Sequence, residues 1–230
     1  MAASISRPDI SLETTRATAG VARPIPVSIP EEHVTGLSSL CEQALRFAAV
    51  AHVDQKRKAS DVPYLMHPCA VAMILLRAGV SDDRILAAAL LHDTVEDTVT
   101  TAADLQREFP AEVCEIVGDL TEQKTDAHGE KRPWEARKQD HIAHIAQMSD
   151  AARSVLLADK LHNLSAMLYD LQQAQHEDDV WNQFSRPKDK VIWYHEQILS
   201  AIGASDDKIL QPLMHECHRL LEAIKSFNAH

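Results

Sequence analysis

The chain has few of the residues that build strands, thiolate cages or membrane spans. Only six of its 230 residues are glycine and 4% are aromatic. No alternating apolar run lies between turn residues, so the sequence gives no strand signal. Its four cysteines form no Cys-x-x-Cys pair, which argues against a zinc cage or a disulfide framework. The longest uninterrupted apolar run, residues 69–76, is too short to span a bilayer.

Basic residues are also scarce, with 23 lysines and arginines against 34 aspartates and glutamates, for a net charge of −11. Nucleic acids and anionic membranes are bound by basic surfaces, so we expect neither as a partner. The N-terminus carries no signal-peptide apolar region. Four scattered thiols suit a reducing compartment, and we expect a cytoplasmic protein. Whether it forms a homo-oligomer is left open.

Residues 1–36 differ in composition from the rest of the chain. They hold four of the ten prolines and show no apolar period, which predicts a flexible tail. A transit peptide is a weaker alternative, because Asp9 and Glu13 interrupt the acid-free pattern of such leaders.

From residue 37 onward the apolar residues recur with helical spacing. We therefore predict an all-α fold, a helical bundle, with one domain over residues 37–228. Helix-opening prolines and one capping box set the boundaries. The expected helices include an apolar stripe over 40–51, then 68–78, 82–94, 133–147, 150–171, 187–202 and 206–227. Between 94 and 133 we expect one helix after the capping box of Thr101 and Asp104, and another opened by Pro110.

The run HDTVED at residues 92–97 places one imidazole and three carboxylates directly after seven apolar residues. An unpaired buried carboxylate is costly, and a divalent cation is the usual compensation. On a regular helix His92 and Glu96 share one face, as do Asp93 and Asp97. The first pair would then hold an ion, and the second would face solvent or substrate.

Two more residues have the character of metal ligands. His67 stands beside a helix start, and Asp159 lies inside an apolar helix. With His92 and Asp93 they offer two nitrogens and two anionic oxygens. This donor set suits manganese, iron or zinc better than calcium, which prefers oxygen alone.

The order His67, His92-Asp93, Asp159 resembles the HD phosphohydrolase superfamily, whose ligands follow the pattern H…HD…D. The segments QKRK at 55–58, PY at 63–64, LLHDTVEDT at 90–98 and LADKLHNL at 157–164 are similar to one branch of it. That branch is the alarmone hydrolases, meaning the hydrolase domain of Rel/SpoT proteins and small stand-alone relatives. The resemblance implies an HD-domain helical bundle. Because 230 residues leave no room for a synthetase domain, it implies a stand-alone hydrolase.

The resemblance also assigns roles. It implies one divalent ion, commonly manganese, held by His67, His92, Asp93 and Asp159. Glu96 and Asp97 would orient and deprotonate the attacking water. The implied reaction removes the 3′-pyrophosphate of guanosine tetra- or pentaphosphate and gives GDP or GTP with pyrophosphate.

Substrate-binding residues follow from the same resemblance. Arg57 and Lys58 match a basic pair near the base and phosphates, and Asn163 matches a ribose contact. A pyrophosphate needs further cations, and the segment after residue 121 supplies them. The candidates there are Lys124, Arg137 and Lys138, with Lys131 and Arg132 between them.

Each feature has a plainer explanation. Lys124, Arg137 and Lys138 taken singly suit an ordinary surface, and Trp193 with Tyr194 suits a core. The same metal site could act on an adenosine alarmone or on the 2′-phosphate of NADPH. A non-catalytic nucleotide-sensing module is the alternative from another class. Glu96 and Asp97 argue against it, since a sensor has no need of water-activating carboxylates.

Overall fold

The computed structural model describes residues 36–58 and 60–227. Over this part of the chain it contains α-helices, one 3-10 turn and two isolated bridge pairs, but no strand. The predicted all-α fold is confirmed. Apart from Gly36, the predicted tail lies outside the described residues, so its separation from a domain at 37–228 stays a prediction. In the described part, no helix has both the length and the apolar character needed to cross a bilayer.

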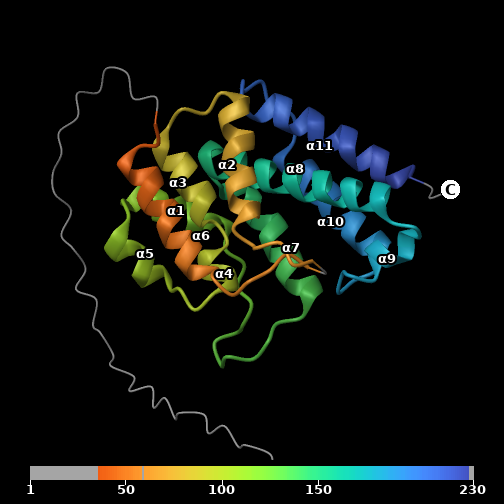
Figure 1. Ribbon diagram of the computed structural model, residues 1–230, viewed down its shortest axis with the longest axis horizontal. Helices are drawn as coiled ribbons and strands as arrows, with labels where there is room; N and C mark the ends of the chain where they lie inside the picture. Colours follow the sequence, from red (N-terminus) through yellow and green to blue (C-terminus); the bar gives the residue numbers. More distant parts are fainter. Residues whose placement is uncertain (1–35, 59, 228–230) are drawn as a thin grey trace, which may run out of the picture. The chain divides into compact units, whose positions relative to one another are not determined.

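Helix α3 (Asp83–Leu91) lies among other helices of the bundle (Figure 1). It packs against α1 (Ser39–Ala51), α2 (Met66–Ala78), α6 (Ala111–Leu120) and α8 (Asp150–Gln173). Every residue from 86 to 91 is buried. A helix surrounded by other helices buries apolar side chains on all sides, which explains a run without a helical period.

Helix α8 is the second central element and the longest, with 24 residues. Helix α11 (Leu210–Lys225) lies along it, and α2 packs nearby (Figure 1). Helix α10 (Lys188–Ile202) contacts α11 and α7 (Trp134–His144). The short elements are α4 (Thr94–Asp97), α5 (Ala102–Glu108), the 3-10 turn Ile145–Gln147 and α9 (Glu177–Trp181).

Several predicted boundaries are confirmed. Thr101 and Asp104 form a capping box at the start of α5. Gly79 ends α2 with φ 97°, a left-handed conformation that glycine adopts without strain. Pro110 and Pro133 occupy the N-caps of α6 and α7.

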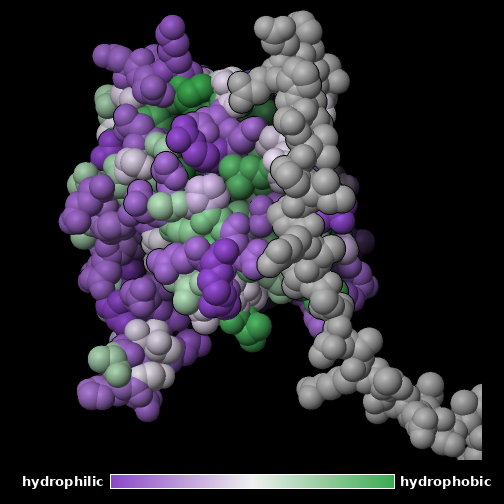
Figure 2. Space-filling view, turned by 90° about the vertical axis from the view of Figure 1, so that its left-hand side faces the viewer, coloured by the Kyte–Doolittle hydropathy of each residue, from purple (hydrophilic) through white to green (hydrophobic). Residues whose placement is uncertain are grey.

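Other boundaries differ from the prediction. Helix α2 begins at Met66, two residues before Pro68, and α11 begins at Leu210 rather than at 206. Helix α9 was not predicted. The face shown in Figure 2 is mainly hydrophilic, with separate hydrophobic positions, as is usual for a folded surface.

The expected helix over 82–94 is wrong in one important respect. Helix α3 ends at Leu91, and a new short helix, α4, begins at Thr94. Between them Asp93 has φ −95° and ψ −5°, in the bridge region at the edge of helical space. The break removes the expected pairing of His92 with Glu96, but the Asp97 N–H still donates to the Asp93 carbonyl at 2.9 Å, so Asp93 and Asp97 share one face as expected. His92 lies beside its own neighbour Asp93 instead, with 3.1 Å between Nε2 and Oδ2.

Candidate metal centre and active site

Three core helices bring a histidine and carboxylate cluster together. His67 lies in the first turn of α2, His92 directly follows α3, and Asp159 lies in the middle of α8. Their ligand atoms all lie within 4.8 Å of one another. His67 Nε2 is 3.1 Å from Asp159 Oδ1, and His92 Nε2 is 4.0 Å from the same oxygen.

Asp93 lies against this cluster as its fourth residue and second carboxylate. Its Oδ2 lies 3.1 Å from His92 Nε2 and 3.4 Å from His67 Nε2. Ligands about 2.0–2.2 Å from one ion are separated from each other by roughly 3–3.5 Å, so these spacings fit a shared cation. The same oxygen accepts a hydrogen bond of 2.6 Å from the Tyr64 hydroxyl, which holds it toward the histidines.

The cluster also has a ring nitrogen without a hydrogen-bond partner and the negative charge that a cation would bind. His92 Nε2 is buried and makes no hydrogen bond, despite its closeness to Asp93. Burial lowers the pKa of His92, but the carboxylates of Asp93 and Asp159 outweigh burial and raise it to about 9. This point of the pocket therefore favours positive charge. His67, His92 and Asp159 form a candidate divalent metal site.

Neighbours on α8 hold Asp159 in place. The Lys160 ammonium lies 2.7 Å from Asp159 Oδ2, and Asn163 Nδ2 donates to Asp159 Oδ1 at 2.6 Å. Burial raises the pKa of Asp159, but Lys160 and His67 more than offset it and hold it well below its usual range. Asp159 is thus an anion with one oxygen directed at the histidines and the other paired with Lys160.

Glu96 and Asp97 line the same pocket as the cluster, and this pocket has a volume of about 180 Å³. The Lys124 ammonium lies 2.5 Å from Asp97 Oδ1 and 3.3 Å from Glu96 Oε1. Burial, reinforced by the nearby Glu122 carboxylate, raises the pKa of Glu96 in spite of Lys124. A carboxylate with a raised pKa is a better proton acceptor near neutral pH.

Glu122 is the centre of a buried polar network that the sequence did not suggest. Its side chain is 4% exposed, and it pairs with Arg137 at 3.0 Å and with Lys138. The Tyr194 hydroxyl donates to Glu122 at 3.2 Å, and His141 lies 3.6 Å away. Burial raises the pKa of Glu122, but His141 and Lys138 lower it by more. The pKa is therefore below its usual range, and the group stays ionised. Arg137 and Lys138 are therefore mostly buried cations, whereas Trp193 and Tyr194 pack as expected against the core.

The predicted nucleoside-binding residues lie at the edge of this pocket. Arg57 Nη2 is 3.4 Å from Asn163 Oδ1, and its guanidinium stacks over Tyr64 at 5.7 Å. Asn163 also lines the pocket. Lys58 points toward Phe184, whose ring centre lies 5.7 Å from the ammonium. Arg57 and Asn163 are thus next to the cluster, whereas Lys58 directly follows Arg57 in sequence and is directed at Phe184.

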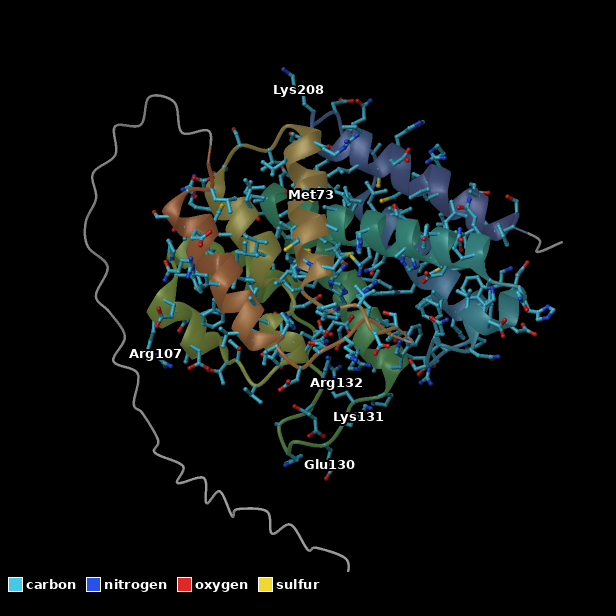
Figure 3. All side chains as sticks on the ribbon, in the orientation of Figure 1. Met73, Arg107, Glu130, Lys131, Arg132 and Lys208 are labelled. Carbon is cyan, nitrogen blue, oxygen red and sulfur yellow. The ribbon has the colours of Figure 1, made fainter. Side chains whose placement is uncertain are left out.

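Two basic residues considered with these are not in the pocket. Glu130, Lys131 and Arg132 lie on the loop that projects between α6 and α7 (Figure 3). Lys131 is exposed, and Arg132 pairs with Asp140. The sequence also gave no role to Tyr64, Lys160 or His162, although their positions around the ligand motifs were a usable signal.

His162 contacts one of the candidate ligands. Its Nδ1 lies 2.7 Å from His67 Nδ1. Burial, together with His67 and Arg57, lowers the pKa of His162 to about 4. It is therefore a neutral imidazole at physiological pH.

Comparison with known proteins agrees with this geometry. The model of the HD domain matches residues 44–190. The chain belongs to the HD domain family. The match includes every candidate metal ligand, and it covers α2, α3 and α8, which supply them.

Within the HD domain family the chain is similar to guanosine-3′,5′-bis(diphosphate) 3′-pyrophosphohydrolases named MESH1. It is 42% identical to that of Xenopus tropicalis over 129 residues, which are 55% of this chain and 69% of the relative. It is 43% identical to the human protein over 124 residues, 53% of this chain and 66% of the relative. This HD domain is a homologue of those hydrolases.

A solved structure supports the same relationship. It is that of a metazoan ortholog of SpoT described as hydrolysing ppGpp and as having a role in starvation responses. The two share a TM-score of 0.65 and 28% identity, over 81% of this chain and 97% of the other.

Proposed function

We propose that this HD domain hydrolyses the 3′-pyrophosphate of guanosine tetra- and pentaphosphate, giving GDP or GTP and intact pyrophosphate. One observation carries the proposal: Glu96, a half-buried carboxylate of raised pKa, lines the same pocket as the His67, His92 and Asp159 cluster. The similarity to MESH1 hydrolases supplies the substrate. We place the active domain at residues 37–228, in the cytoplasm, with its oligomeric state open.

The metal in this proposal is one Mn²⁺ ion, with His67, His92, Asp93 and Asp159 as ligands. The donor set of two imidazoles and two carboxylates supports it, because the two anions neutralise a dication and the nitrogens suit a transition metal. When bound, such an ion acidifies water and neutralises charge that develops on a phosphoryl group.

Glu96 and Asp97 would handle the proton and the position of the attacking water. In the proposal a Glu96 carboxylate oxygen accepts the water proton, and Asp97 orients the water by a hydrogen bond. The oxygen of water bonds to the phosphorus attached to the ribose 3′-oxygen, and the bond from that phosphorus to the 3′-oxygen breaks. The 3′-oxygen takes up a proton and becomes a hydroxyl, which balances the proton that water gave to Glu96. The pocket supports these roles, since burial favours the proton on Glu96.

The basic residues around the pocket would bind the substrate. Arg57, Lys58 and Asn163 are assigned to the nucleoside. Asn163 lines the pocket, and Arg57, on the loop before α2, contacts Asn163. Lys124, Arg137 and Lys138 are assigned to the phosphates. Such cations are needed because the substrate carries more negative charge than one dication neutralises.

A turnover assay with Mn²⁺ and a nucleotide panel tests the proposal. The panel holds guanosine tetraphosphate, its adenosine counterpart, NADPH and GTP, with products separated by chromatography. We expect GDP and intact pyrophosphate from the first, and no reaction with GTP, which has no 3′ substituent. Orthophosphate as the primary product, or GTP hydrolysed equally fast, would contradict the proposal.

A further inference from the structure

The two histidines of the candidate metal site differ in what holds their second ring nitrogen. His92 Nδ1 lies 2.8 Å from the backbone oxygen of Ala89. A carbonyl oxygen can only accept, so the hydrogen of neutral His92 lies on Nδ1 and its Nε2 is bare. The backbone of α3 therefore fixes the form of His92 that can bind a metal.

His67 has a side chain at the corresponding place. Its Nδ1 lies 2.7 Å from His162 Nδ1, and the two ring centres are 4.8 Å apart. Two ring nitrogens at this distance share one hydrogen, which either ring can carry. Unlike a carbonyl, His162 does not dictate by its chemistry alone which ring donates.

The pocket side of His67 makes this choice important. His67 Nε2 lies 3.1 Å from Asp159 Oδ1 and 3.4 Å from Asp93 Oδ2, both of which accept hydrogen bonds. These carboxylates favour a hydrogen on Nε2, where it would block a metal. A hydrogen bond from His67 Nδ1 to His162 favours the opposite tautomer, with Nε2 bare.

We propose that His162 is a positioning residue that selects the metal-binding tautomer of His67 by accepting the hydrogen of its Nδ1. The inference rests on the metal site proposed above and goes beyond it, since His162 itself is not a ligand. It follows Asp159 by three residues on α8, so one helical turn carries both a ligand and the acceptor for another ligand. Hydrogen bonds of this kind typically change metal affinity by about 10–100-fold.

A matched pair of variants separates the role of His162 as a hydrogen-bond acceptor from its role in packing. Asparagine places its Oδ1 where histidine has Nδ1, whereas leucine has the same branched shape without an acceptor. We expect metal-free His162→Asn to bind Mn²⁺ in calorimetry about as tightly as the unaltered protein. His162→Leu should bind roughly 10–100-fold more weakly. His218→Leu, at an exposed position of α11, controls for the loss of one histidine.

Nitrogen NMR gives a direct reading that does not depend on activity. In ¹⁵N-labelled protein loaded with diamagnetic Zn²⁺, we expect the hydrogen on His67 Nδ1 and a ¹⁵N–¹⁵N coupling across the bond to His162. This measurement uses the unaltered chain, so it holds even if a variant does not fold. A hydrogen on His162 Nδ1, or no coupling, would overturn the inference.

The outcomes also distinguish this inference from the metal site on which it rests. His67→Ala with undiminished Mn²⁺ affinity would reject the site itself. Weak binding by His67→Ala, but unchanged binding by His162→Leu, would reject only the role of His162. Equal losses of Mn²⁺ affinity in His162→Asn and His162→Leu would also reject the role of His162, because the imidazole ring as a whole, and not its acceptor nitrogen, would then matter.

Discussion

Replacing Glu122 by glutamine should lower the free energy of unfolding, because it leaves two buried cations without their shared anion. Glu122 is 4% exposed and is the shared anion of Arg137 and Lys138, whose side chains are only 13% and 17% exposed. Glutamine keeps the shape and one acceptor for Tyr194 but leaves both cations without their anion. Breaking a buried ion pair costs about 3–5 kcal/mol, and the retained acceptor favours the lower end. For a domain of this size, about 3 kcal/mol lowers Tm by roughly 6–12 °C.

Thermal unfolding of Glu122→Gln beside Glu115→Gln, an exposed control on α6, measures this effect. The pKa of Glu122 is lower in the folded state than in the unfolded chain, so the ionised group stabilises the fold fully above the ordinary value of about 4.3. That contribution is lost as the pH falls toward the lower folded pKa. The difference in Tm should therefore be constant between pH 5 and 7 and should narrow below about pH 4.

The same substitution tests whether these cations are available to phosphates. Without the Glu122 anion, Arg137 and Lys138 should attract pyrophosphate more strongly, so added pyrophosphate should raise the Tm of Glu122→Gln more than that of the unaltered protein. An unchanged Tm would refute the argument that Glu122 holds two desolvated cations. A lower Tm with no greater response to pyrophosphate would refute only their role as phosphate binders.

Other predictions concern the metal, the proton and the nucleotide. Asp93→Asn removes an anionic ligand, so elemental analysis of the purified variant should show most of the metal lost; retained stoichiometric metal would reject Asp93. Glu96→Gln should keep the metal while turnover falls roughly 10²–10⁴-fold, and near-normal turnover would mean that Glu96 is not the base. Because the pKa of Glu96 is raised, kcat/KM of the unaltered enzyme should fall with decreasing pH already above the usual glutamate range, and an acid limb at or below that range would contradict this. Arg57→Ala with Lys58→Ala should raise KM more than it lowers kcat, since such contacts act about equally in the ground and transition states; steady-state kinetics that show mainly a loss of kcat would argue otherwise.

Local sequence patterns predicted most of the fold because helix termini carry local signals. The Thr101 capping box and the left-handed Gly79 needed no knowledge of the rest of the chain. The break between α3 and α4 was missed for the opposite reason. His92 and Asp93 leave the regular helix where both face the same pocket, and that pocket is formed by α2 and α8, which come from distant parts of the sequence.

In the candidate site, too, the residues that local motifs carry were predicted, and those that depend on contacts between distant segments were missed. Its ligand residues were found because short motifs carry them, and the structure brings His67, His92 and Asp159 together. Glu122 was missed because its partners lie 15, 16 and 72 residues away and only packing makes it a buried anion. The position of His162 three residues after Asp159 was a local signal, but only packing brings it to the ring of His67, 95 residues earlier in the chain.

The candidate ligands come from α2, from the end of α3 and from α8, and this affects the dynamics of the core. An ion held by all three would act as a cross-link between segments far apart in sequence, and opening any one of them would first require its release. At a free-ion concentration 100 times Kd this adds about 2.7 kcal/mol to the unfolding free energy. The backbone amides of these three helices should then exchange with deuterium as one cooperative unit in the loaded protein, and as separate units after chelation.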